Sequence, residues 1–253
     1  MFFNIRERVV FYNPALREHK LIHTKRFSQP DFMYQYCAHG FGYDSKANDY
    51  KFVRILCHCE DWLYKAEVYT LGTDSWRDIP FQVDEKVDLL YDQGVYLEGL
   101  FYWKCSKIVS FDMSEEKFCC IPLPDRDPDA VLTTLTVWNG SLVCFSRLGE
   151  RDWHSMCYEM WVMANNNNDG NGGVTWTKHL TFGPLARVRR PLRFLNEEEL
   201  LLEAGDGRIV SYNIRAETLK KLPIRGAILD GQTYADFYVE TLVSLRSRRA
   251  NAS

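Results

Sequence analysis

The chain has 253 residues, of which 46% are hydrophobic, 26% charged and 14% aromatic, as in a folded globular protein rich in strand-favouring residues. Its formal net charge of −3 argues against a nucleic-acid binder, and no apolar run approaches the roughly 18 residues of a membrane helix. Because the first residues contain no signal-peptide core, we expect a cytoplasmic protein, alternatively a nuclear one, that binds neither nucleic acid nor membrane.

The strongest pattern is a short aromatic strand that recurs five times, each time followed by a polar turn and a second strand. The repeats are spaced by roughly 40–50 residues, and in a chain without helical periodicity such a period is typical of a β-propeller. In chain order the aromatic anchors are Tyr12, Tyr69, Phe111, Trp161 and Tyr212. Seven residues after the anchor come His19, Trp76, Phe118 and Leu219 in four of the copies.

A second kind of hairpin alternates with the anchored ones. Turn residues lie in the middle of four of these front hairpins, at Asn48-Asp49, Glu98-Gly99, Asn139-Gly140 and Asn196-Glu197. A front hairpin followed by an anchored back hairpin makes one four-stranded blade. Strands that are apolar on both faces, such as residues 209–212, suit a blade packed between two others. The front hairpins start at Gly42, Gly94, Leu135, Arg193 and Tyr234.

The two ends of this pattern complement each other. The pattern opens on a back hairpin, Val9–Ile22, and closes on a front hairpin, Tyr234–Leu245. Pairing these two would complete a composite blade and protect both edges of the ring. We therefore expect one all-β domain over residues 8–245, a propeller of about five four-stranded blades, followed by a basic disordered tail over residues 246–253. The alternative is a larger propeller that lacks its N-terminal blade.

The repeat strings resemble a known family. GYDSKANDYKFVRI (from Gly42), GVYLEGLFYW (Gly94), IVSFDMSEEKF (Ile108) and GRIVSYNIRAETLKKL (Gly207) are similar to the kelch-like F-box-associated β-propeller of plant F-box proteins, above all of the pollen S-locus F-box proteins. The resemblance implies a non-catalytic substrate receptor of an SCF-type ubiquitin ligase complex. It also implies a protein substrate, a basic style S-ribonuclease recognised in pollen self-incompatibility.

Family members carry an F-box ahead of the propeller, and this small helical module docks a Skp-type adaptor. These residues contain no such module, so the adaptor and the cullin are expected as partners only if an F-box is supplied. Two alternatives stay open. One is a truncated protein-binding propeller outside any ligase, including a non-functional allele; the other is a propeller hydrolase that uses loop carboxylates.

Two groups of residues have the types that site chemistry requires. Cys37, His39 and the run Cys57-His58-Cys59 offer nitrogen and sulfur donors for zinc, but C-x-C differs from the spacing of structural zinc sites. We therefore expect reduced thiols, no metal and no cofactor. The chain has no G-x-S-x-G, and its six histidines are scattered over different repeats, so we expect no catalytic residue.

Recognition is expected on long inter-blade loops, because loops on a rigid scaffold commonly carry binding residues. The candidate loops are His23–Phe41, Phe81–Gln93, Leu123–Thr134, Thr181–Leu192 and Arg225–Thr233. An acidic rim would steer a basic ribonuclease, although the same charges have the spacing of ordinary solvated loops. The residues predicted to bind protein are Asp84, Glu85, Asp88, Asp125, Asp127 and Asp129 in two acidic loops, and Arg187, Arg189 and Arg190 in a basic one.

Overall fold

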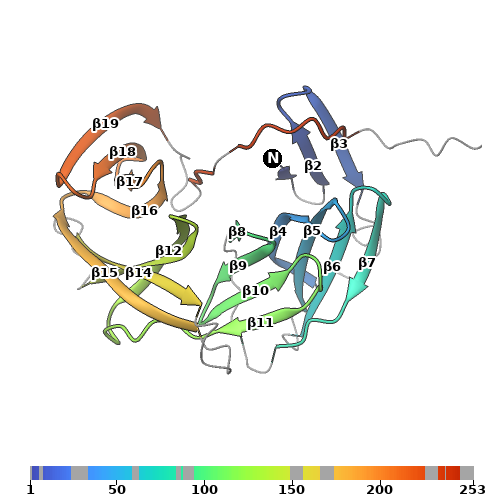
Figure 1. The fold of residues 1–253 in the computed structure, drawn as a ribbon, viewed down its shortest axis with the longest axis horizontal. Helices are drawn as coiled ribbons and strands as arrows, with labels where there is room; N and C mark the ends of the chain where they lie inside the picture. The colour runs from blue at the N-terminus through green and yellow to red at the C-terminus, as the bar shows by residue number, and fades with distance from the viewer. Residues whose placement is uncertain are drawn as a thin grey trace, which may run out of the picture. The chain divides into compact units, whose positions relative to one another are not determined.

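The computed structural model describes residues 2–5, 8–23, 34–58, 63–83, 87, 94–148, 156–165, 174–225, 233–236 and 238–245. Every element within these ranges is a β-strand, which confirms the all-β prediction (Figure 1). The chain divides into two compact units, residues 1–120 with 237–253 and residues 121–236. They contain five antiparallel sheets, four with four strands and one with three, which is the number predicted for the blades.

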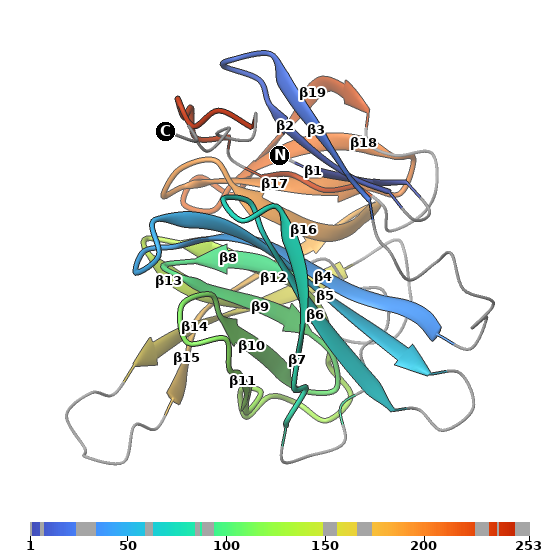
Figure 2. The ribbon, with the colours of Figure 1, turned by 90° about the vertical axis from the view of Figure 1, so that its right-hand side faces the viewer.

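The first unit holds three of the sheets. In each sheet the strands follow one another in chain order, as Figure 2 shows for the second sheet. The first sheet consists of β1 (Phe2–Ile5), β2 (Arg8–Asn13) and β3 (Glu18–His23). The second consists of β4 (Tyr34–Asp44), β5 (Asp49–His58), β6 (Tyr64–Thr70) and β7 (Ser75–Ile79). The third consists of β8 (Val95–Leu97), β9 (Leu100–Lys104), β10 (Ile108–Asp112) and β11 (Phe118–Ile121).

The second unit holds the remaining two sheets, built in the same way. The fourth sheet consists of β12 (Val131–Trp138), β13 (Ser141–Leu148), β14 (Met156–Asn165) and β15 (Val174–Leu185). The fifth consists of β16 (Val188–Phe194), β17 (Glu199–Ala204), β18 (Arg208–Asn213) and β19 (Thr218–Arg225). In both sheets a front hairpin is followed by an anchored back hairpin, as the repeat pattern predicts.

The aromatic anchors lie on the first strand of each back hairpin. Tyr69, Phe111, Trp161 and Tyr212 are buried, on β6, β10, β14 and β18, and Tyr12 is half-buried on β2. The residue seven places later lies directly opposite in the next strand, as in the pairs Tyr12–His19, Tyr69–Trp76 and Tyr212–Leu219. The seven-residue spacing within each copy is therefore the distance along the chain, across the turn, between two residues that face each other in the back hairpin.

Within each unit, consecutive sheets share apolar cores. One cluster joins β5 and β6 to β9 and β10, with Ile55 on one side and Trp103 and Phe111 on the other. In the second unit, Tyr158 of the fourth sheet packs in one cluster with Tyr212 of the fifth. Strands covered by a neighbour on both faces need apolar residues on both faces, which explains why their sequences do not alternate.

The tight front turns also follow the prediction. Both central residues have positive φ at Glu98-Gly99 (48° and 89°) and at Asn139-Gly140 (48° and 72°). That is the conformation of the turns that match the twist of paired strands, and asparagine and glycine adopt it at the lowest cost.

A shared five-residue turn, which the sequence pattern did not reveal, ends the anchored strands. Asn13, Asp112 and Asn213 each follow an anchor, and each side-chain Oδ1 accepts the N–H groups two and three residues later. The fourth residue after each has positive φ. Asp44 shapes the β4–β5 turn in the same way. The sequence feature that predicts this turn is an aspartate or asparagine directly after the anchor.

The predicted front hairpin Tyr234–Leu245 is wrong. Residues 233–236 and 238–245 form no strand. The edge of β2 that the hairpin would pair with is taken by β1, from Phe2 opposite Phe11 to Ile5 opposite Arg8. The composite blade fails because β1, a single short strand, lies ahead of the first anchored hairpin and was not read from the sequence.

Residues 238–245, here called the C-terminal strap, nevertheless contact the hairpin β2–β3. Asn13, which is buried, donates from Nδ2 to the carbonyls of Thr241 and Val243, both at 2.9 Å. Glu18 accepts the Leu245 N–H at 2.9 Å, and Leu245 is buried in the cluster around Phe11. Two side chains at the turn end of the hairpin thus hold the strap, while β1 occupies the edge where a paired strand was expected.

Candidate recognition surface

The loop between β11 and β12, residues 122–130, presents three exposed carboxylates, those of Asp125, Asp127 and Asp129. It also contains three prolines, which restrict its backbone. Asp127 Oδ1 accepts the Asp129 N–H at 2.9 Å, and the Asp127 carbonyl accepts the Ala130 N–H at 3.0 Å. We call this segment the acidic loop.

Two further contacts fix the acidic loop. The Arg126 guanidinium donates to the carbonyl of Ala130, so the one cation of the loop is used internally. At the start of the loop, Trp176 of β15 donates from its indole N–H to the Pro122 carbonyl at 2.8 Å. The acidic loop is therefore a shaped, negatively charged segment whose carboxylates face solvent.

The other predicted acidic residues, Asp84, Glu85 and Asp88, lie outside the described residues. Around them, Phe81, Val83 and Val87 pack against the core of the first unit. The Tyr64 hydroxyl also donates to the Val87 carbonyl at 3.1 Å. The start of this loop and its central residue Val87 are thus held against the core of the first unit.

The segment Thr181–Leu192 was predicted to be a basic loop, and this prediction is wrong because most of the segment lies in two strands. β15 continues to Leu185, β16 begins at Val188, and only Ala186 and Arg187 connect them, with Arg187 at a φ of 59°. The segment contains Gly183-Pro184, a pair that usually interrupts a strand. The strand passes through it because β15 is the outer strand of its sheet, where a missing N–H costs no ladder bond.

The three arginines of this segment lie in different surroundings. Arg187 is exposed in the turn, whereas Arg189 and Arg190 are half-buried on β16. Arg190 Nε lies 2.9 Å from a carboxylate oxygen of Glu203, its Nη2 donates to the Thr233 carbonyl at 2.7 Å, and its guanidinium lies 5.7 Å from the Tyr234 ring. Arg190 therefore has internal partners on three sides.

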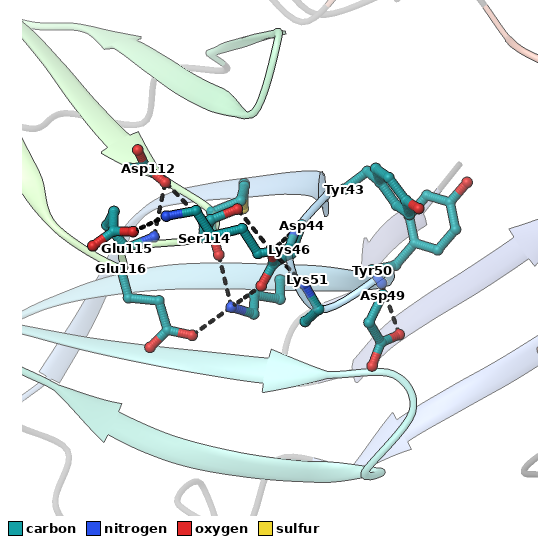
Figure 3. Close-up of polar contacts among 12 residues, drawn as sticks. Tyr43, Asp44, Lys46, Asp49, Tyr50, Lys51, Asp112, Ser114, Glu115 and Glu116 are labelled. Atoms are coloured by element: carbon teal, nitrogen blue, oxygen red, sulfur yellow. Dashed lines mark hydrogen bonds and ion pairs between the residues drawn. The ribbon is translucent and has the colours of Figure 1, made fainter.

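The string GYDSKANDYKFVRI forms a polar joint between the second and third sheets, within the first unit (Figure 3). The Lys51 ammonium is buried and lies 2.6 Å from Asp44 Oδ2 and 2.6 Å from Glu116 Oε1. It also donates to the Met113 carbonyl at 2.7 Å. One lysine on β5 thus neutralises carboxylates from the β4–β5 and β10–β11 turns.

Asp44 completes this joint. Its Oδ1 accepts the Ser114 hydroxyl at 2.7 Å and the N–H of Ala47 at 3.0 Å. Burial alone would raise the pKa of Asp44, but the hydrogen bonds from Lys51, Ala47 and Ser114 together lower it to about 2. The carboxylate stays charged, and its oxygens are used inside the protein. Asp44 and Lys51 of GYDSKANDYKFVRI therefore have a structural role, because they join two sheets of the first unit.

The cysteine and histidine candidates lie in apolar surroundings. His39 is stacked on Phe52, with ring centroids 5.9 Å apart, and burial lowers its pKa to about 4. Cys57 Sγ lies 3.5 Å from the His58 carbonyl. The described residues contain no group of three or more metal-ligating side chains, and the side chains of Cys37 and Cys59 lie outside them. The described ranges also contain no helix long and apolar enough to span a membrane.

Comparison with known proteins identifies the repeat pattern. The family model for the F-box associated beta propeller domain matches residues 1–240. Among curated proteins of Arabidopsis thaliana, an F-box/kelch-repeat protein is 27% identical over 82% of this chain and 56% of its own length. The F-box protein CPR1 is 23% identical over 85% of the chain and 59% of its own length. The chain thus spans about half the length of the curated relatives that it matches.

Proposed function

Since the chain belongs to the F-box associated beta propeller family, we propose that it is the substrate-recognition domain of an F-box protein in an SCF-type ubiquitin ligase. Its relatives are F-box proteins, and an all-β scaffold with loops set on rigid sheets suits a receptor. The ligase partners, a Skp-type adaptor and a cullin, would join through an F-box and not through the propeller.

We further propose that the substrate is a basic protein, specifically a style S-ribonuclease met in the cytoplasm of the pollen tube. The acidic loop is the observation that carries this proposal. Its three carboxylates are exposed, and the loop is held by its own hydrogen bonds. It can therefore bind a positively charged surface without a large entropic cost of ordering. Such a charge pattern selects and steers a partner more than it adds affinity.

The test removes charge from the acidic loop without disturbing its shape. Asp125→Asn with Asp129→Asn leaves Asp127, whose carboxylate braces the loop, in place. Binding to a panel of basic ribonucleases is measured by surface plasmon resonance at low and high salt. We expect about a tenfold loss of affinity at low salt, mainly in the association rate, and a smaller loss at high salt.

The matched control removes two exposed charges elsewhere, Glu197→Gln with Glu240→Gln. Equal losses in both double variants would reduce the effect to net charge and overturn the site. A pull-down with a Skp-type adaptor tests the ligase half of the proposal. Firm binding of the adaptor to this chain by itself would contradict docking through a separate F-box.

A further inference from the structure

β19 is the outer strand of the fifth sheet. It pairs with β18 on one side and stands at the end of the strand order, with no described strand on its other edge. Of its eight residues, seven are exposed and Leu222 is half-buried. Side chains on both faces of this strand therefore reach solvent.

The strand is basic, and within the described structure the pKa of the Glu199 carboxyl group is lowered by side-chain hydrogen bonds and also by Lys220, which lies nearby without forming an ion pair with it. Lys220, Lys221 and Arg225 have no carboxylate within 4.0 Å in the part of the chain that is described. Arg225 also lies directly opposite Arg208 in the antiparallel register. Like charges in such cross-strand positions destabilise a sheet. The pair is only partly compensated, by Asp206 at 3.4 Å from Arg208 Nε.

Apolar side chains are interspersed with these cations. Leu219 is 47% exposed and Ile224 is 55% exposed, near the two ends of the strand. A strand with cations and exposed apolar groups on a free edge has the features of a surface that binds an extended peptide.

We propose that β19 binds an acidic, extended segment of a partner protein, with carboxylates against Lys220, Lys221 and Arg225 and apolar side chains over Leu219 and Ile224. The occupant follows from charge complementarity, because a carboxylate between Arg208 and Arg225 would relieve their repulsion. Pro223 has no N–H, so backbone pairing with the peptide is confined to Thr218–Leu222. This surface is distinct from the acidic loop, which would take a partner of the opposite charge.

The probe is a fluorescein-labelled peptide in which pairs of glutamates alternate with pairs of valines, so that carboxylates lie on both faces of the extended chain. It is as long as β19, and its binding is measured by fluorescence anisotropy with the full chain. Affinity should fall as salt rises. Lys220→Glu, Lys221→Glu and Arg225→Glu together should weaken binding by at least about tenfold. A peptide with lysine in place of glutamate should not bind.

Arg17→Glu is the matched control. Arg17 is an exposed cation in a five-residue turn, and Glu116 and Glu217 already occupy the equivalent position in other turns. It should change affinity by less than about twofold. Circular dichroism melting checks each variant, and Lys220→Gln with Lys221→Gln replaces the triple variant if that one melts early.

Three outcomes would overturn the proposal. The first is unchanged binding in the charge-reversed strand, and the second is an equal loss in Arg17→Glu. The third is the pattern expected if these lysines serve only to block strand pairing at a sheet edge. In that case the neutral variant, Lys220→Gln with Lys221→Gln, would gain self-association in light scattering and would keep its peptide binding.

Discussion

At the scale of single residues, Lys51 links the second and third sheets of the first unit. A buried ammonium is costly unless it is paired and hydrogen-bonded, and Lys51 has two carboxylates and one carbonyl within 2.7 Å. Its partners come from two turns far apart in the sequence, at Asp44 and at Met113 and Glu116. The joint therefore stabilises a particular placement of the second sheet against the third more than it strengthens either hairpin.

We expect Lys51→Met to lower the free energy of unfolding by about 3 kcal/mol, because the buried Asp44 carboxylate would lose its one ion-pair partner within the described structure and Glu116 would keep only Arg77. Urea unfolding followed by tryptophan fluorescence measures this loss. Lys46→Met is the control, since Lys46 pairs with Glu115 of the same β10–β11 turn but in solvent, and it should change stability little. Similar losses in the two variants would show that burial of the Lys51 ammonium does not matter.

The sequence allowed part of this joint to be anticipated. GYDSKANDYKFVRI is one of the strings that carry the family resemblance, but the string by itself does not show whether its charged residues bind a partner or stabilise the fold. That choice depends on what Asp44 and Lys51 face, and both face a turn about 60 to 70 residues later in the chain. Pairings of this kind arise from tertiary packing and are not visible in local patterns.

At the scale of elements, the hairpins follow from local rules more reliably than the connections do. Anchor spacing and turn residues such as Asn139-Gly140 act within one hairpin, so the sequence predicts them well. The segment Thr181–Leu192 was predicted to be an inter-blade loop, but β15 continues through Gly183-Pro184 to Leu185, because an outer strand tolerates proline. The segment Tyr234–Leu245 was misjudged because its alternating pattern is that of a strand, whereas β1 occupies the edge it needs.

The C-terminal strap is held by the Asn13 side chain, which also shapes the β2–β3 turn. We expect Asn13→Ala to increase hydrogen exchange of residues 238–245 and to lower the free energy of unfolding by about 1 kcal/mol, because the variant removes two part-buried hydrogen bonds to carbonyls of the strap. Asn213→Ala is the control, since Asn213 makes the equivalent turn bonds in the fifth sheet. It should leave exchange of the strap unchanged.

If both variants loosened the strap equally, or if neither did, the hydrogen bonds of Asn13 to Thr241 and Val243 would not be what holds the strap.

The two most exposed large apolar side chains of the described structure, Leu242 and Val239, lie on the C-terminal strap. Release of the strap should therefore also add little apolar surface beyond that of Leu245, and dye binding to exposed apolar surface should rise only slightly.

At the scale of the whole molecule, each compact unit has apolar clusters of its own, and each unit contains a buried cysteine thiol. Cys57 lies in the core of the first unit, and Cys144 is fully buried in the second. Burial raises the pKa of Cys144 to about 12, which suppresses the reactive thiolate in addition to blocking access. Cys119, on the outer strand β11, is exposed.

These thiols make the opening of the two units measurable in one experiment. We expect a thiol reagent to label Cys119 at least about a hundredfold faster than Cys144 under native conditions, because Cys144 reacts only from an opened state. Mass spectrometry of digested samples gives the rate at each site. Lys51→Met should speed labelling of Cys57, which shares its unit, more than labelling of Cys144. Fast native labelling of Cys144 would show that the second core is not closed, and equal acceleration at both thiols would show that the two units open together.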